Sequence, residues 1–425
     1  MKSQPKAVFL HTGYRTAGTW LWSCFRSLDQ VTGYYEPLHE MLAKIDPTAL
    51  AKSTADSWRS GHPTLEAPYF AEFAHLLRDD APGIDGFDER FSIDSLNGKT
   101  PESADRLAAY VNHLTRTANE AGRVPVFKFC RSLGRLHWFH STFPDAVHIV
   151  VMKNPISQWQ SCWELLAKHD NAHFVAIPFA VLDMNRNAPM VKRVLEALHV
   201  ELPDASRTFK DTTLDQCVDF YKQHVKTIAP ETAYRAFLAH WLLTLQHATA
   251  HSDAIFDCDL AARSSAYAEA AEHWIAKMSG LEPSFGSMRQ TSSKQRDCGF
   301  NAAQGLDIHL QAFDLAKALT ADGAIDNGTL SLWASKLAQA TQVLAFGPDV
   351  NWPQANAPMH RATRVVDIAL IDGIGMDGAM ISELAATRTA LNDARSQLAK
   401  FKRAPLSRLK KKVRKLFTAK ENRAA

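Results

Sequence analysis

Residues 11–21 read His-Thr-Gly-Tyr-Arg-Thr-Ala-Gly-Thr-Trp-Leu and directly follow the apolar run at 7–10. This pattern predicts a buried strand, then a turn marked by glycines, and then the start of a helix. Backbone N–H groups at the start of a helix point outward and, together with the helix dipole, favour a bound anion. The stretch therefore predicts an anion-binding loop, and Arg15 places a cationic side chain within it.

The spacing from Gly13 to Gly18 is that of a Walker A loop, but the residues that follow are different. Thr19 and Trp20 stand where that loop has a lysine and then a serine or threonine. The lysine reaches the β- and γ-phosphates of a nucleotide, and the hydroxyl group binds Mg²⁺. The sequence therefore keeps the features of a phosphate-binding loop without the groups that metal-dependent triphosphate chemistry needs.

A second candidate anion site follows another apolar run. Residues 147–152 are apolar apart from His148, and Lys153-Asn154-Pro155 comes directly after them. Ser161 lies eight residues after Lys153. This arrangement again predicts a strand followed by a helix. Parallel α/β sheets bind their ligands at such junctions, so both candidate sites fall where a ligand is expected.

Together the two motifs resemble those of bacterial-type sulfotransferases that use 3′-phosphoadenosine 5′-phosphosulfate (PAPS). The loop of that family, Lys/Arg-Ser-Gly-Thr-Thr-Trp/Leu-Leu, is similar to residues 15–21. Its second motif is a strand ending in Arg-x-Pro with a serine eight residues after the arginine, and Phe-Pro-Asp-Ala at 143–146 also resembles the family. The chain departs from the family at Ala17, usually glycine, and at Lys153, usually arginine. We therefore expect the turn at Ala17 to accept a Cβ atom.

The resemblance covers about residues 6–290 and implies an α/β fold, a P-loop-like three-layer sandwich with a central parallel sheet. It implies transfer of a sulfuryl group from PAPS to a hydroxyl group, of a carbohydrate or glycolipid, with no metal ion. The implied cofactor-binding residues are Arg15, Thr16, Ala17, Gly18, Thr19, Trp20, Lys153 and Ser161, with Lys294 and Arg296 as candidates for a third phosphate-binding cation. Arg15 is also the cation expected to stabilise charge on the oxygen that leaves sulfur.

The same resemblance implies a carboxylate base in the segment 33–40, and Glu36 is the first candidate. His39 is the second, while His137 and His140 are candidates because other members of the family use a histidine. Lys128 ends a predicted strand and is expected near the sulfate or the acceptor. Three tryptophans near the motifs, Trp138, Trp159 and Trp163, are candidates for stacking on a sugar, although such residues more often belong to the core.

The rest of the sequence predicts alternating strands and helices, with 40–100 mixed, 170–250 and 300–350 largely helical, and 351–375 irregular. Such alternation is typical of a parallel sheet. The predicted strands are 6–11, 124–129, 147–152 and 254–257, and the predicted helices 20–28, 102–121, 133–142 and 157–168. We expect a sulfotransferase domain at 1–299, a helical extension at 300–375, and a C-terminal helix with a basic tail at 376–425.

Charge and composition place the basic character at the end of the chain. The net charge of the 425 residues is +3, but residues 400–425 alone carry +10, which leaves −7 for the rest. Six scattered cysteines favour a reducing compartment. The first ten residues lack the apolar core of a signal peptide, and no run of 18 apolar residues exists, so we expect a cytoplasmic protein.

The C-terminal region suggests two further partners. Leucines repeat every seven residues within 377–401, which allows an oligomer through a marginal coiled coil. Residues 406–417 place apolar residues on one helical face with lysine and arginine beside it, as in helices that lie on anionic membranes. No specific nucleic acid is expected. Two other functions stay open: a P-loop kinase-like phosphotransferase, and a non-catalytic membrane-associated scaffold with a decayed nucleotide fold.

Overall fold

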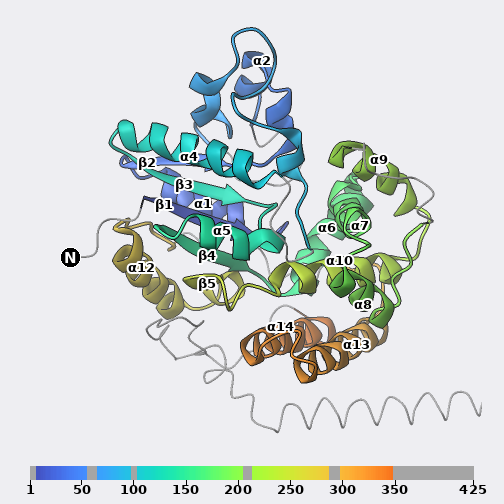
Figure 1. Cartoon of the computed structure of the whole chain (residues 1–425). Coiled ribbons are helices and arrows are strands. Elements are labelled where there is room, and N and C mark those ends of the chain that lie inside the picture. Colours follow the sequence, from blue (N-terminus) through green and yellow to red (C-terminus); the bar gives the residue numbers. More distant parts are fainter. Residues whose placement is uncertain (1–5, 55–64, 97–102, 204–212, 287–296, 348–425) are drawn as a thin grey trace, which may run out of the picture. The chain divides into compact units, whose positions relative to one another are not determined.

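The computed structural model describes residues 6–54, 65–96, 103–203, 213–286 and 297–347 (Figure 1). The chain separates into two units, residues 1–374 and 375–425, and the second lies outside the described residues. The predicted irregular segment at 351–375, C-terminal helix and basic tail, and also Lys294 and Arg296, fall outside them as well. The expected domain boundary at residue 299 stays a prediction.

The core of the described chain is one sheet of five parallel strands in the order β2-β3-β1-β4-β5. The strands are β1 (Ala7–Thr12), β2 (Val31–Tyr35), β3 (Val124–Phe129), β4 (Ala146–Met152) and β5 (Ala254–Asp257). The expectation of an α/β fold with a central parallel sheet is confirmed. Four strands agree with the predicted ones to within one residue at each end.

Helices flank this sheet, and α1, α4, α5 and α6 correspond to the four predicted helices, with bounds that differ by up to three residues (Figure 1). They are α1 (Gly18–Arg26), α2 (Pro47–Ala51), α4 (Ala104–Glu120), α5 (Leu136–Thr142), α6 (Pro155–His169), α7 (His173–Met184), α8 (Pro189–Ala197), α9 (Leu214–His224), α10 (Pro230–Leu245), α11 (Cys258–Ala261), α12 (Ser265–Ser279), α13 (Ala302–Ala321) and α14 (Asn327–Phe346). Short 3₁₀ helices lie at Glu40–Ala43, Ala71–Leu76, Glu89–Ser92 and Leu133–Arg135. Within the described ranges, no helix combines the length and apolar character needed to cross a membrane.

Strand β2 was not among the predicted strands, and Gly33 at its centre explains why. A glycine inside a strand weakens the strand pattern and often marks a close approach of another backbone. Here side chains of α1 approach instead, because a Cβ on Gly33 would lie 3.0 Å from Arg26 Cγ and 3.1 Å from Trp22 Nε1. The glycine lets α1 pack tightly across β2, and it removes the side chain that would have made the strand visible in the sequence.

Two neighbouring tyrosines of β2 show that helices cover both faces of the sheet. The Tyr34 hydroxyl donates a hydrogen bond of 3.2 Å to the Leu114 carbonyl in α4. The Tyr35 ring instead packs against Trp22 of α1, with 5.0 Å between the ring centroids. Since successive side chains of a strand point to opposite faces, α1 and α4 lie on opposite sides of the sheet.

The strand order defines where a ligand is expected to bind. The chain leaves β1 toward β2 on one side of the sheet, and it leaves β4 toward β5 on the other. Adjacent strands whose connections diverge open a crevice at their carboxyl ends, and α/β proteins bind ligands there. Both predicted anion motifs, after β1 and after β4, lie at this point of the strand order.

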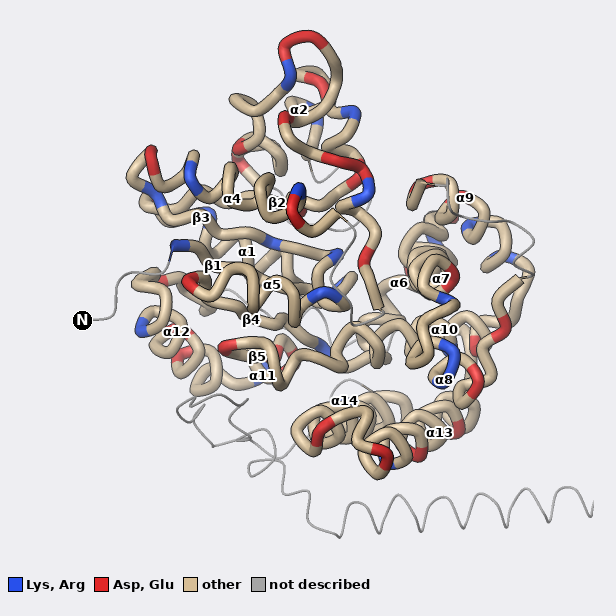
Figure 2. The backbone as a smooth tube through the Cα atoms, in the orientation of Figure 1, with Lys and Arg blue, Asp and Glu red and all other residues tan. Residues whose placement is uncertain are grey.

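Charged residues are nearly absent from the strands. Among the five strands only Lys128 in β3 and Asp257 in β5 carry a charge (Figure 2). Both stand near the carboxyl end of their strand, at the edge where the crevice opens. Each belongs to a buried network of ion pairs, and these two networks lie on either side of the loop that follows β1.

Candidate active site

The loop between β1 and α1 is held in an unusual backbone conformation. Arg15 and Ala17 have φ values of 61° and 65°, and Glu36 has a φ of 41°. These are three of the five non-glycine residues with positive φ in the described chain. The left-handed region costs such residues about 1–2 kcal/mol each, and strain of this kind gathers at functional sites. The turn at Ala17 therefore accepts the Cβ atom only with strain, because it keeps the conformation that glycine prefers.

Gly18 begins α1 where the helix meets the end of β1. A Cβ at this position would lie 2.6 Å from Thr12 Cγ2, which fixes glycine here. The helix has no side-chain cap and no acidic residue in its first turn. Its first N–H groups therefore keep their capacity to bind an anion.

The two threonine hydroxyl groups of the loop bind protein atoms. Thr16 Oγ1 donates a 2.9 Å hydrogen bond to the Gly13 carbonyl, and Thr19 Oγ1 lies 3.3 Å from the Tyr35 hydroxyl. The loop thus offers backbone N–H groups and Arg15 to a ligand, while these hydroxyl groups maintain the loop itself.

The two anion motifs meet through their side chains. Arg15 Nε donates a 3.0 Å hydrogen bond to Ser161 Oγ, although 146 positions separate them in the sequence. The Arg15 guanidinium also lies over the Phe174 ring of α7, 5.3 Å from its centroid. Lys153 follows β4 directly and is half-buried. Asn154 caps α6, since its Oδ1 accepts the N–H of Ser157 at 2.9 Å.

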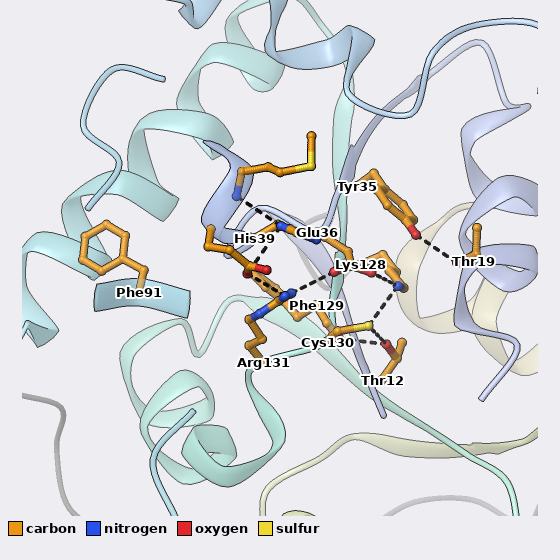
Figure 3. A network of polar contacts seen from close by, with 12 residues as sticks. Thr12, Thr19, Tyr35, Glu36, His39, Phe91, Lys128, Phe129, Cys130 and Arg131 are labelled. Carbon is orange, nitrogen blue, oxygen red and sulfur yellow. Dashed lines mark hydrogen bonds and ion pairs between the residues drawn. The ribbon is translucent and has the colours of Figure 1, made fainter. Parts of the chain in front are cut away.

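A second group of charged residues lies at the ends of β2 and β3 (Figure 3). Lys128 Nζ is 2.6 Å from Glu36 Oε1, and Arg131 Nη1 is 2.9 Å from Glu36 Oε2. Arg131 Nη2 also contacts Glu40 Oε2 at 2.6 Å. The side chains of Arg131 and Lys128 are 2% and 4% exposed, so these pairs are shielded from solvent. Sequence reasoning identified Glu36 and Lys128 and missed Arg131 and Glu40, which belong to neither motif.

These pairs determine the protonation of the two carboxylates. Burial by itself would raise the pKa of Glu36, but Lys128 and Arg131 hold that pKa well below its ordinary value. In the same way, Arg131 outweighs the effect of burial at Glu40 and lowers its pKa to about 2. A carboxylate with such a low pKa is a weak base, so Glu36 can accept a proton efficiently only when its contacts with the cations weaken.

Lys128 also connects this group to the loop after β1. Its Nζ donates to Cys130 Sγ at 2.9 Å, and the same sulfur lies 3.1 Å from Thr12 Oγ1 (Figure 3). Thr12 in turn lies against Gly18, the first residue of α1. The structure thus brings Glu36 and Lys128 to the same edge of the sheet as the anion motifs.

The histidines proposed as alternative bases lie in different settings. His39 is buried, and burial lowers the pKa of its ring. Its Nδ1 lies 3.1 Å from the backbone N of Met41 and 3.4 Å from Glu40 Oε2, so protein groups already engage this nitrogen. His137 and His140 lie on α5, where His137 packs against His247 and His140 against His251, with ring centroids 5.2 Å and 6.0 Å apart.

Two of the four tryptophans that the sequence singled out belong to the core. Trp159 is fully buried and donates from Nε1 to the Cys298 carbonyl at 2.9 Å, and Trp138 is 6% exposed. Trp163 is half-buried and stacks on Trp159. Trp20 is also half-buried and packs against Phe285, 5.9 Å between centroids. Trp138 and Trp159 therefore present no free face to a sugar, whereas Trp20 and Trp163 keep part of their surface accessible.

Comparisons of the chain with protein-family models, curated proteins and solved structures give no match. Among the residues that the structure describes, no group of three or more histidine, cysteine, aspartate or glutamate side chains is placed to hold a metal ion. What the site does must therefore be argued from its own residues.

Proposed function

We propose that this chain is a sulfotransferase that moves a sulfuryl group from PAPS to the hydroxyl group of a carbohydrate or glycolipid. One observation carries the proposal: Arg15 and Ser161, one from each anion motif, meet at 3.0 Å between the carboxyl ends of β1 and β4. A nucleotide with phosphate groups at both its 3′ and 5′ positions needs two anion sites within the reach of one ribose. Two such sites at adjacent strand ends fit that requirement.

The residues divide naturally between the two phosphates. The loop N–H groups and Arg15 would bind the 5′-phosphosulfate, and Arg15 would stabilise the negative charge that develops on the oxygen leaving sulfur. Lys153 and Ser161 would bind the 3′-phosphate, with Lys153 as a point charge. When the nucleotide binds, Arg15 would exchange its hydrogen bond with Ser161 for the 5′-phosphosulfate, and Ser161 would bind the 3′-phosphate.

Glu36 would take the proton of the acceptor hydroxyl group. The acceptor oxygen forms a bond to sulfur while the bond from sulfur to the 5′-phosphate oxygen breaks, which leaves adenosine 3′,5′-bisphosphate. An anionic sulfuryl group near Lys128 would compete with Glu36 for that ammonium, and the pKa of the carboxylate would then rise toward the working pH. In this scheme binding of the donor itself activates the base.

The other two functions explain fewer of these residues. A P-loop kinase-like phosphotransferase would lack both the lysine and the Mg²⁺-binding hydroxyl group, since Thr19 and Trp20 follow Gly18. A non-catalytic scaffold would account for the departures at Ala17 and Lys153. It would give no reason for three strained residues and two cationic motifs at one edge of the sheet.

Isothermal titration calorimetry of the full chain tests the proposal. Adenosine 3′,5′-bisphosphate should bind in the presence of EDTA, while ATP with Mg²⁺ should bind much more weakly. The opposite order would favour the phosphotransferase, and failure of both ligands to bind would favour the scaffold. If the bisphosphate binds, ³⁵S-labelled PAPS added to a cell extract would then show which class of molecule becomes labelled.

The basic tail at 400–425 gives the proposal a second, separate part. We propose that it holds a cytoplasmic enzyme at an anionic membrane surface, where each basic residue contributes about 1 kcal/mol and salt weakens the attraction. Deletion of 400–425 should abolish sedimentation with phosphatidylserine vesicles at low salt and leave activity on a water-dissolved acceptor unchanged. Vesicle binding by the truncated chain would reject this part alone.

A further inference from the structure

A second buried network of charges lies on the other side of the loop, at the end of β5. Lys336 of α14 places its Nζ 2.6 Å from Asp257 Oδ2 and 3.0 Å from Asp259 Oδ2. The side chains of Lys336 and Asp257 are fully buried and that of Asp259 is 5% exposed. Two carboxylates therefore share one ammonium in the interior, and the ammonium comes from the helical extension.

Asp259 carries this network to the second anion motif. Its Oδ2 accepts the backbone N–H of Asn154 at 2.6 Å, and its Oδ1 accepts the Asn154 side-chain amide at 2.9 Å. Asn154 is the residue that caps α6. Asp259 thus holds Asn154, the residue directly after Lys153, and Asp259 itself is paired with Lys336.

The same carboxylate also interacts with Lys153. Burial by itself would raise the pKa of Asp259, and Lys336 and then Lys153 act against it to lower that pKa. With Lys336 present, the two acidic residues leave one negative charge for Lys153 to face. Without it the pair leaves one negative charge if one carboxylate takes up a proton and two if both stay ionised; in either case Asp259 loses its ammonium partner, and it would draw Lys153 toward the interior and away from a phosphate group.

We propose that Lys336 is a positioning residue of the second anion motif: by neutralising the Asp257–Asp259 pair it keeps Asn154 and Lys153 arranged for a phosphate group. The inference rests on the proposed function, because it concerns the 3′-phosphate site of that proposal. It makes α14 part of the binding site, although Lys336 lies 77 positions from Asp259 in the sequence.

The first test compares two ligands that differ only in the 3′-phosphate. The full chain and its Lys336→Met variant are titrated with adenosine 3′,5′-bisphosphate and with AMP. Methionine keeps the length of the side chain and removes its charge. The variant should bind the bisphosphate at least about 10-fold more weakly, the value of one charge-assisted contact, with AMP binding nearly unchanged. Equal losses for both ligands would overturn the inference.

Two further variants separate charge from simple structural damage. Leu337→Ala removes a neighbouring buried side chain of α14 without touching a charge, and it should lower stability without changing the ratio of the two affinities. If Leu337→Ala also lowers the affinity for the bisphosphate relative to that for AMP, then Lys336 acts only through folding. Adding Asp257→Asn to Lys336→Met removes one surplus carboxylate charge, keeps an oxygen to cap α11, and should restore the ratio.

If Lys336→Met does not fold, Asp257→Asn alone still gives a decision. Removing this charge should strengthen binding of the bisphosphate by several-fold and leave AMP binding unchanged, and weaker binding of the bisphosphate would overturn the inference. The unaltered chain separates this outcome from the larger proposal. If the unaltered chain binds the bisphosphate no better than AMP, the proposed function fails. If it prefers the bisphosphate and every variant keeps that preference over AMP, only the role of Lys336 is rejected.

Discussion

Lys128 Nζ lies 2.6 Å from Glu36 Oε1, and Arg131 holds the other oxygen of the same carboxylate at 2.9 Å. This double contact keeps Glu36 ionised and at the same time makes it a weak base. Lys128 also reaches toward the loop after β1 through Cys130. The basicity of Glu36 is therefore linked to whatever anion binds beside Lys128.

Replacing Glu36 with glutamine tests its assignment as the base. Glu36→Gln keeps the shape of the side chain and removes its ability to accept a proton. We expect the turnover number for sulfuryl transfer to fall by roughly 10²–10⁴-fold, the usual contribution of a general base. The affinity for adenosine 3′,5′-bisphosphate, measured by calorimetry, should stay nearly the same. Near-normal turnover in this variant, with loss of activity in His39→Ala or His140→Ala, would instead assign the proton to a histidine.

Arg131 should be the main source of stability in this cluster. Arg131→Met leaves Glu36 and Glu40 as buried carboxylates with one fewer cation, and breaking a buried pair in this way costs about 3–5 kcal/mol. Because both carboxylates have lowered pKa values, their contribution is present above about pH 4.5 and is lost as pH falls toward the folded-state values, about 2 for Glu40. Urea unfolding at pH 7 and pH 3 should show that the variant loses less stability on acidification than the original chain.

Much of this site follows from the sequence because its motifs are local. The loop at 11–21 and the segment at 153–161 each carry their own strand, turn and helix signals, and the parallel sheet then places their ends side by side. The meeting of Arg15 and Ser161 follows from that arrangement. Strand β2 did not follow from the sequence, because Gly33 removes a side chain from the strand pattern and its close packing against α1 becomes visible only in the fold.

Other residues of the site leave no local signal. Arg131 lies two residues after β3 and Glu40 in a short 3₁₀ turn, and neither falls in either anion motif. Their pairing depends on how β2 and β3 align, which a single sequence does not specify. Lys336 is more distant still, because it lies in a helical region where one buried lysine resembles any other until the fold places it beside Asp257.

The strain at Ala17 predicts a stabilising substitution. Its φ of 65° is costly for alanine and free of cost for glycine, so Ala17→Gly should gain about 1 kcal/mol, although the greater freedom of glycine in the unfolded chain reduces the gain. Thermal unfolding should show a melting temperature equal to or above that of the original chain. The matched control, Ala268→Gly within α12, should lower it, and an equal fall in both variants would show that the turn at Ala17 is not strained.

Lys153 should distinguish the two phosphates of the nucleotide. Lys153→Ala removes one charge-assisted contact to the 3′-phosphate, which is worth about 1.5–3 kcal/mol. Adenosine 3′,5′-bisphosphate should therefore lose roughly 10- to 100-fold in affinity, while AMP, which has no 3′-phosphate, should lose little. Calorimetric titration of both ligands measures the difference, and similar losses for the two would remove Lys153 from the 3′-phosphate site.

His240 should make the fold sensitive to acid. It lines a cavity of about 20 Å³ behind Gly13 and Thr16, room for about one water molecule, and burial lowers the pKa of its ring to about 4. Above pH 6.5 the ring is neutral in both the folded and the unfolded chain, so it has no effect on the pH dependence. Between pH 6.5 and 4 only the unfolded chain takes up the proton, and stability falls by an amount on the order of 3 kcal/mol.

His240→Phe keeps a ring in this place and removes its titration. Urea unfolding at a series of pH values from 7 to 4.5 should then show a shallower loss of stability than in the original chain. An unchanged slope in His240→Phe would mean that the ring already binds a proton in the folded state, and its place behind the loop would then supply a positive charge beside the 5′-phosphate site.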